Sequence, residues 1–466
     1  MIKNINFIEY KKNNNKFIQN FFIDNNEKSK LGIVYTPFSL VEKIINMIPI
    51  NYFNNNTKWL DIGSGLGNFS FIIYEKLLNN SNLNYNNIIK NLYFSEIQED
   101  QIKYLKELFG KDINLFDNFF NISNNSNNFI EYFDVIIGNP PYNYGKIKTP
   151  TNSQINKKDE GKSIWQKFII ESLKLLKWGG FLCLIVPAIW LKPDKSGIYE
   201  LLTSYKILKL SCLSNNETNK EFNYKAQTPT CYFLIQKILS NNNNNNILIY
   251  DQLHKDYINY TLKKNYPIPM SNISIINKFL EKVNLLGTIK IHKTNCLPNK
   301  INLSTNENEF YKFQNISSCL LEGNQKLLPV LLKFYSDYSA PHYGIRKLIL
   351  SHKMYGFPFL DDEGLYGISA RDNYIIKDYS KEKLIKIGKF LSSKTIIFLY
   401  SSTAYRMKYL EKYIFYFIPD ISNELIFDNL PDNILERDKI IQDYFHLSEK
   451  EREIINSSVK NYKFFL

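Results

Sequence analysis

The sequence is poor in cysteine and contains no long apolar run. Its 466 residues include five cysteines, widely scattered and without a Cys-x-x-Cys pair, so neither a zinc site nor a disulfide framework is predicted. The longest apolar run, Phe181–Leu191, is interrupted by Pro187 and is much shorter than the roughly 20 residues of a membrane-spanning helix. The N-terminus lacks a secretory pattern. We therefore expect a cytoplasmic protein that holds no metal and enters no membrane.

Acidic side chains are fewer than basic ones. The chain has 58 Lys and Arg against 45 Asp and Glu, which gives a net charge of +13. The excess is densest in residues 251–410, whose net charge is +10, whereas residues 411–466 carry −4. This distribution favours a polyanionic partner, although lysine-rich solubility would give the same sum. Aromatic side chains make up 15% of the residues and supply stacking surfaces as well as core.

Strands and helices alternate in the first half of the chain. The apolar patterns predict strands at 58–62, 92–96, 113–115, 133–138, 181–187, 208–213 and 230–236, and helices at 69–78, 98–109 and 164–177. Such alternation predicts an α/β fold in which helices cover both faces of a parallel sheet. Ligands of these sheets bind at the carboxyl ends of the strands. The asparagine tract Asn241–Asn246 is the best candidate for a domain boundary.

A glycine loop, Asp61-Ile62-Gly63-Ser64-Gly65-Leu66-Gly67, links the first predicted strand to its helix. Glycine allows the backbone to turn sharply and to pass close to a ligand. The dinucleotide fingerprint GxGxxG is not met, because Asn68 stands where its third glycine would be. A plain glycine turn between a strand and a helix is the alternative interpretation.

Two acidic residues follow the next two strands. Glu96 ends the second predicted strand, where a carboxylate can accept both hydroxyls of a ribose. Asp117 follows the third strand and could accept from an adenine amino group. Each could equally be a surface carboxylate in a loop.

The loop Asn139-Pro140-Pro141-Tyr142 follows the strand FDVIIG directly. Two prolines stiffen the loop and remove two backbone donors, which leaves acceptors: the Asn139 side-chain oxygen and the Pro140 carbonyl. Acceptors that take both hydrogens of an aromatic amine pull its nitrogen towards sp³ geometry and free the lone pair for attack on a sulfonium methyl group. Tyr142 offers a flat ring on which a base can stack. Placed after a buried strand and downstream of the glycine loop, this motif favours chemistry over a simple turn.

With these motifs in this order, residues 31–240 resemble the amino-methylating DNA methyltransferases of the adenine-N6 type. Gly32–Ile48 resembles the extra cofactor segment of the group in which that segment comes first, with Tyr35-Thr36-Pro37 as its core. The resemblance implies S-adenosyl-L-methionine as the cofactor. The implied cofactor-binding residues are Tyr35, Thr36, Pro37, Asp61, Gly63, Gly65, Glu96, Asp117 and Asn139, and the implied catalytic residues are Asn139, Pro140 and Tyr142.

The resemblance also implies an architecture. We expect an N-terminal extension at 1–30, a class I, Rossmann-like methyltransferase domain at 31–240 with a mostly parallel seven-stranded sheet, an asparagine linker at 241–246 and an α+β target-recognition domain at 247–466. The partner is expected to be double-stranded DNA, from which the target base is rotated into the site. Phe222 matches the family's second stacking aromatic, with Tyr224 as the competing assignment. We expect a monomer, with or without a separate cognate restriction endonuclease.

Several other activities share part of this sequence pattern. Related loops occur in enzymes that methylate a protein glutamine or an RNA guanine, but these do not require a basic, aromatic-rich second half. Cytosine-C5 methylation needs a cysteine nucleophile, and the sequence has no Pro-Cys pair. Cytosine-N4 methylation is chemically close, although its loop usually begins with serine. A fused endonuclease is not expected, and an inactive DNA-binding relative is the alternative from a different class.

Overall fold

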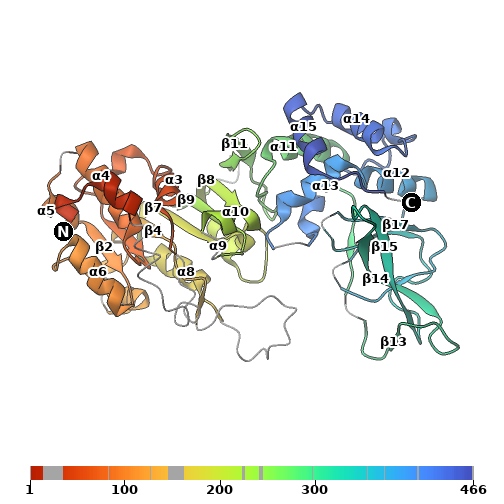
Figure 1. The fold of residues 1–466 in the computed structure, drawn as a ribbon, viewed down its shortest axis with the longest axis horizontal. Coiled ribbons are helices and arrows are strands. Elements are labelled where there is room, and N and C mark those ends of the chain that lie inside the picture. The colour runs from red at the N-terminus through yellow and green to blue at the C-terminus, as the bar shows by residue number, and fades with distance from the viewer. Residues whose placement is uncertain are drawn as a thin grey trace. The chain divides into compact units, whose positions relative to one another are not determined.

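The computed structural model describes residues 2–13, 35–81, 83–125, 127–144, 162–222, 226–240, 245–295, 297–353, 355–371, 373–406 and 409–463. The chain divides into two compact units (Figure 1). Unit 1 comprises Met1–Ile249 with Thr261–Lys263, and unit 2 comprises Tyr250–Tyr260 with Lys264–Leu466. The predicted linker at 241–246 lies mostly outside the described residues, and the predicted domain limits stay a prediction.

A nine-stranded sheet has the order β11-β10-β8-β9-β7-β4-β1-β2-β3, and it belongs to unit 1 except for the end of β10 and most of β11, which belong to unit 2. Strands β3, β2, β1, β4 and β7 run parallel to one another, whereas β9 is antiparallel to both β7 and β8. The seven strands predicted within residues 31–240 are all present in this sheet as β1, β2, β3, β4, β7, β8 and β9, and β10 and β11 extend the sheet beyond β8. The strands are β1 (Trp59–Ile62), β2 (Leu92–Ser95), β3 (Asn114–Phe116), β4 (Phe133–Gly138), β7 (Leu176–Pro187), β8 (Tyr205–Leu213), β9 (Thr230–Leu239), β10 (Asn246–Asp251) and β11 (Asp256–Thr261).

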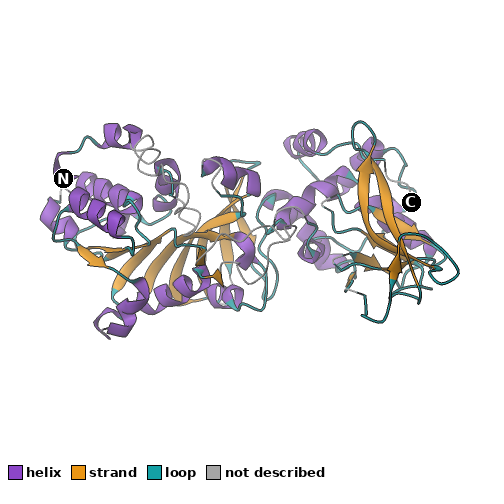
Figure 2. Ribbon diagram, turned by 60° about the horizontal axis from the view of Figure 1, so that its bottom comes forward, coloured by secondary structure: helices purple, strands orange, loops and turns teal. Residues whose placement is uncertain are grey.

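Helices cover both faces of this sheet (Figure 2). They are α3 (Phe38–Ile45), α4 (Asn68–Ser81), α5 (Tyr85–Ile89), α6 (Glu99–Phe109), α7 (Ile122–Asn125), α8 (Trp165–Leu175), α9 (Ile198–Thr203) and α10 (Asn215–Glu221). A short hairpin of β5 (Asn143–Tyr144) and β6 (Lys162–Ser163) stands apart from the sheet. The predicted helix at 164–177 ends two residues early, because Leu176 already pairs with Phe133 as part of β7.

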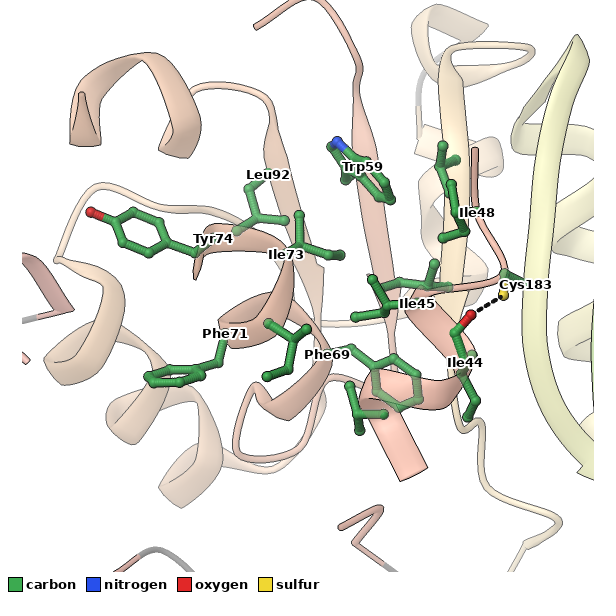
Figure 3. Packing of buried hydrophobic residues seen from close by; sticks show 14 of the residues in the cluster. Ile44, Ile45, Ile48, Trp59, Phe69, Phe71, Ile73, Tyr74, Leu92 and Cys183 are labelled. Atoms are coloured by element: carbon green, nitrogen blue, oxygen red, sulfur yellow. Dashed lines mark hydrogen bonds between the residues drawn. The ribbon is translucent and has the colours of Figure 1, made fainter. Parts of the chain in front are cut away.

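The core of unit 1 joins α3 and α4 to the sheet (Figure 3). Ile44 and Ile45 of α3 and Phe69 of α4 pack with Trp59 of β1, and all four are at most 4% exposed. The Cys183 thiol of β7 donates to the Ile44 carbonyl at 3.5 Å. This packing fixes the segment that precedes α3 and the glycine loop that precedes α4.

A helical turn at residues 7–13 packs on the same helices. The Tyr10 ring stacks on Phe71 of α4 with ring centroids 4.5 Å apart, and its hydroxyl contacts that of Tyr104 on α6. Lys11 forms ion pairs with Glu42 of α3 at 2.7 Å and with Glu75 of α4 at 2.6 Å. The start of the chain thus belongs to the packed unit.

In the described residues of unit 2, two small sheets are combined with five α-helices. One sheet has the order β12-β19-β16-β17 and is antiparallel, and the other has the order β13-β15-β14-β18 around a long β14–β15 hairpin. Asp438 of α14 accepts from the backbone N–H groups of Lys394 and Thr395, which satisfies the first turn of α13. The strands are β12 (His292–Lys293), β13 (Leu303–Ser304), β14 (Phe313–Glu322), β15 (Leu328–Ser336), β16 (Lys347–Leu350), β17 (Pro358–Asp361), β18 (Gly367–Ile368) and β19 (Tyr374–Ile376). The helices are α11 (Ile273–Leu286), α12 (Lys381–Leu391), α13 (Lys394–Tyr400), α14 (Ile434–Tyr444) and α15 (Glu449–Ser458).

Among the described residues, no helix is both long and apolar enough to cross a membrane. Over the same ranges, no group of three or more His, Cys, Asp and Glu side chains is placed to hold a metal ion.

Candidate functional site

The glycine loop lies at the carboxyl ends of β1 and β2. Gly63, Gly65 and Gly67 all have positive φ angles, of +63°, +56° and +77°. A Cβ on Gly67 would stand 2.7 Å from the Phe109 ring of α6, so the close packing of α6 excludes a side chain there. Ser64 joins the two strand ends, because its N–H donates to the Ser95 carbonyl at 2.9 Å and its hydroxyl accepts from the Ser95 N–H at 3.1 Å.

Glu96 holds this loop through its carboxylate. One carboxylate oxygen accepts from the Gly65 N–H at 2.8 Å, and the other accepts from the N–H groups of Ile97 and Gln98 at 2.8 and 2.9 Å. Burial raises the pKa of Glu96, and these three donors oppose that rise. A carboxylate has roughly four acceptor positions, so one remains for a ligand.

Asp61 is fully buried beneath the loop. Its Oδ2 accepts from the Ser70 hydroxyl at 2.7 Å and from the Ser70 N–H at 3.2 Å, while Oδ1 has no hydrogen-bond partner among the described residues. Burial raises the pKa of Asp61 to about 7, opposed by the bonds from Ser70 and reinforced by the charge of Glu96. An acceptor that lacks a partner in a buried position is costly unless something binds it.

The raised pKa of Asp61 predicts a pH-dependent stability. A carboxyl group whose folded pKa exceeds its unfolded value contributes stability below the unfolded pKa, near 3.8, and loses it as the pH rises through about 7. The free energy of unfolding should therefore fall by a few kcal/mol between pH 5 and pH 8, since one pKa unit is worth about 1.4 kcal/mol. Asp61→Asn should flatten that profile and be more stable than the wild type at pH 8.

Urea unfolding of the full chain at several pH values measures this effect. The matched control is Asp100→Asn, which changes an exposed acid on α6. Parallel profiles for the wild type and Asp61→Asn would refute the assignment.

The segment Tyr35-Thr36-Pro37, at the start of α3, lies against the loop. A Cβ on Gly65 would stand 3.3 Å from the Tyr35 ring, so this ring lies directly over the glycine. The Tyr35 hydroxyl accepts from the Gln101 side chain of α6 at 3.0 Å. Burial, and secondarily the charge of Glu96, raise the pKa of Tyr35.

The Asn139-Pro140-Pro141-Tyr142 loop continues β4 at the same edge of the sheet. Gly138 precedes it, and a Cβ there would stand 2.4 Å from the Ile62 carbonyl, so only glycine lets β4 and β1 meet this closely. A Cβ on Gly63 would be 3.7 Å from the Asn139 carbonyl oxygen and 3.6 Å from Pro141. The proline loop therefore abuts the glycine loop, and the Asn139 side-chain N–H donates to the Thr36 hydroxyl at 3.0 Å.

Three further residues were predicted for the site, namely Asp117, Phe222 and the competing Tyr224. Asp117 is exposed and follows β3, whose Phe116 carbonyl accepts from the Glu96 N–H at 3.0 Å, so the two acids leave neighbouring strands. Phe222 is 3% exposed and packs in the hydrophobic core of unit 1, and its stacking role stays a prediction. Tyr224 lies outside the described residues.

Three residues that the sequence analysis did not select complete the site. Asn68 donates its side-chain N–H to the Thr36 carbonyl at 2.8 Å, Ser70 binds Asp61, and Gln101 binds Tyr35. Asn68 and Ser70 immediately follow the glycine loop, but nothing in a local pattern connects a polar residue on α6 to Tyr35. Four chain segments thus meet around the loop, and together they offer backbone donors, carboxylate acceptors and an aromatic surface.

Residues 66–219 match the model of the Eco57I restriction-modification methylase family. This segment resembles restriction-modification methylases. The matched segment, residues 66–219, begins inside the glycine loop and includes the Asn139-Pro140-Pro141-Tyr142 motif. The predicted fold class is confirmed, because the structure has a mostly parallel α/β sheet with the seven strands expected in residues 31–240.

Three individual proteins are similar to part or most of the chain. A putative type II restriction enzyme and methyltransferase of Methanocaldococcus jannaschii is 47% identical over 60 residues, which are 12% of this chain and 5% of that protein. The DNA-bound structure of the type IIL restriction-modification enzyme MmeI is 12% identical, with a TM-score of 0.50 over 95% of this chain and 78% of that chain. A modification subunit of a putative type I restriction enzyme from Vibrio vulnificus is 14% identical, with a TM-score of 0.39 over 59% of this chain and 56% of that chain.

The matched segment and the fold indicate S-adenosylmethionine as the cofactor. The residues present fit such a group. The positive-φ glycines open the backbone beneath Tyr35, Glu96 keeps an acceptor position, and Asp61 has an oxygen without a partner among the described residues. When bound, this cofactor supplies an electrophilic methyl group.

Proposed function

We propose that the protein methylates the N6 amine of adenine in duplex DNA, with S-adenosylmethionine as donor. The observation that carries this proposal is the contact of the Asn139-Pro140 backbone with the glycine loop, because the Asn139 carbonyl oxygen and the Pro140 Cα would each lie 3.7 Å from a Cβ on Gly63. An acceptor pair beside the methyl donor suits a nucleophile with two N–H donors, as an aromatic amine is, and the methylated nitrogen then releases one proton to water.

Asn139 and Pro140 would act together on the target amine. The Asn139 side-chain oxygen and the Pro140 carbonyl each accept one N–H of the amine, which localises the nitrogen lone pair for attack. These hydrogen bonds strengthen as the nitrogen becomes tetrahedral and positively charged, so they stabilise the transition state more than the ground state. The amine is buried in the duplex, so the base must rotate out, at a cost of a few kcal/mol.

Unit 2 is proposed to bind the DNA around the rotated base. Residues 251–410 carry the densest positive charge of the chain, which favours binding to phosphates. Basic and aromatic residues interleave in the exposed loop 342–346, where Tyr343 is 37% exposed and Arg346 is held by Asp362 at 2.7 Å. DNA affinity should accordingly fall steeply as salt concentration rises.

Product analysis tests the proposed function. The purified full chain is incubated with S-adenosylmethionine and unmethylated duplex DNA, and the digested nucleosides are identified by mass spectrometry. N6-methyladenine is the expected product. N4-methylcytosine would keep the mechanism and change the substrate. Methylation of added RNA or of a protein glutamine instead of DNA would refute the DNA proposal. DNA binding without any methyl transfer would identify an inactive relative.

Tyr142 supplies a separate prediction about the base pocket. Its hydroxyl is buried without a hydrogen-bond partner among the described residues, and burial, then the nearby Cys231, raise its pKa. Tyr142→Phe removes that unsatisfied hydroxyl but keeps the ring, so we expect an unchanged or higher unfolding temperature and most of the activity. Tyr142→Ala should raise the Km for DNA and lower turnover, because stacking on a base is worth about 1–3 kcal/mol.

Steady-state kinetics and thermal unfolding of the two Tyr142 variants provide the measurement. Equal losses of activity in both variants would show that the hydroxyl, and not the ring, is what matters.

A further inference from the structure

Thr36 receives two side-chain amides at one buried position. The Asn139 Nδ2 donates to its hydroxyl oxygen at 3.0 Å, and the Asn68 Nδ2 donates to its carbonyl oxygen at 2.8 Å. Thr36 is 5% exposed and Asn68 is 6% exposed, so water competes little for either contact. The segment before α3, the start of α4 and the end of β4 are thereby joined through a single residue.

The first of these contacts holds the Asn139 amide at its nitrogen. An asparagine side chain has a donor end and an acceptor end of nearly the same shape. Methylation of an amine needs the oxygen at the substrate, because an NH₂ group there would oppose the N–H groups of the amine. By accepting from Nδ2, the Thr36 hydroxyl holds the donor end of the amide away from the place that the oxygen must serve.

We propose that Thr36 is a positioning residue that orients the Asn139 amide, and not primarily a ligand of the cofactor. This inference rests on the proposed function for its catalytic consequence. Its physical content is a hydrogen bond that holds the amide nitrogen at Thr36, so that the Asn139 side chain is fixed with its oxygen at the other end. A preorganised acceptor of this kind does not have to be turned during the reaction.

Asn68 holds Thr36 from the other side, through the Thr36 carbonyl oxygen. It occupies the position at which a dinucleotide loop would carry its third glycine, and a glycine there would have no side chain to donate to the Thr36 carbonyl. Asn68→Ala should therefore loosen the whole Tyr35-Thr36-Pro37 segment. We expect it to weaken cofactor binding and slow turnover together, whereas a change confined to the Thr36 hydroxyl should separate the two effects.

Thr36→Val is the central variant, because it keeps the shape of the side chain and removes the hydroxyl. The turnover number should fall about tenfold, which corresponds to the loss of one net hydrogen bond. The dissociation constant for S-adenosylmethionine and the Km for DNA should change less than twofold. Thr36→Ser, which keeps the hydroxyl, should restore most of the turnover.

The matched control is Thr57→Val. Thr57 is also 5% exposed and also belongs to unit 1, but it precedes β1 at the amino end of the strand. Its replacement should leave both turnover and cofactor affinity at wild-type values. A Thr36→Val protein with normal turnover would overturn the inference, and so would one that loses cofactor affinity while keeping its turnover at saturating cofactor.

A double-mutant cycle on unfolding tests the contact without any activity. Thr36→Val should lower the unfolding temperature of the full chain by about 2–4 °C, as expected for one hydrogen bond in a unit of this size. In an Asn139→Ala background the same change should cost clearly less, because its partner has gone. Additive shifts would refute the inference even if the protein methylated DNA. A wild-type protein without methyl transfer would instead refute the proposed function. The double-mutant cycle would still show whether Thr36 and Asn139 interact.

Discussion

Replacing Asn139 by alanine is expected to lower the turnover number several hundred-fold, with cofactor binding and DNA binding nearly intact. The loss follows from removing one preorganised acceptor, which is worth roughly 3–4 kcal/mol by analogy with oxyanion-hole donors. Because the Asn139 oxygen is proposed to act mainly in the transition state, the Km for DNA should not rise. Single-turnover kinetics with saturating cofactor and DNA measure the effect directly.

Asn139→Asp separates the acceptor from the donor of the same side chain. The aspartate keeps an oxygen near the proposed amine position but loses the N–H that binds Thr36, although the threonine hydroxyl can reverse and donate to it. We expect activity between that of the wild type and that of Asn139→Ala. An Asn139→Ala enzyme with full activity would overturn both the mechanism and the assigned substrate.

Replacing Glu96 by alanine is expected to weaken S-adenosylmethionine binding by about 1.5–3 kcal/mol, or roughly 10- to 150-fold. The variant loses a charge that accepts from three backbone N–H groups, one of them in the glycine loop. Those donors would be left buried or would need water, and the loop would lose the contact that fixes Gly65. Calorimetry of the full chain with the cofactor alone measures the change.

Two further variants sharpen the Glu96 experiment. Glu96→Gln keeps the shape but turns an NH₂ group towards backbone donors, so its affinity should lie close to that of the alanine variant. Glu99→Ala removes an exposed acid at the start of α6 and should bind the cofactor as the wild type does. Unchanged affinity in Glu96→Ala would move the proposed ribose contact to another residue.

The sequence by itself determined seven strands, three helices and the motifs of unit 1. The strand 133–138 coincides with β4, and the other predicted strands up to residue 236 overlap strands of the structure, because buried strands are short apolar runs bounded by turn residues. The glycine loop and the proline loop could be placed at strand ends for the same reason. Their chemistry could be inferred because glycine and proline restrict the backbone in ways that depend on few neighbours.

Only the tertiary structure decided which side chains meet. The nine-stranded order, the burial of Phe222 in the core and the links from Asn68 to Thr36 and from Thr36 to Asn139 depend on residues far apart in the chain. Such contacts are set by the pairing of β1 with β4 and by the packing of α3, α4 and α6, and local periodicity carries no information about either. The tertiary structure thus revealed Thr36 as a partner of Asn139, whereas the sequence had indicated only a residue of the cofactor segment.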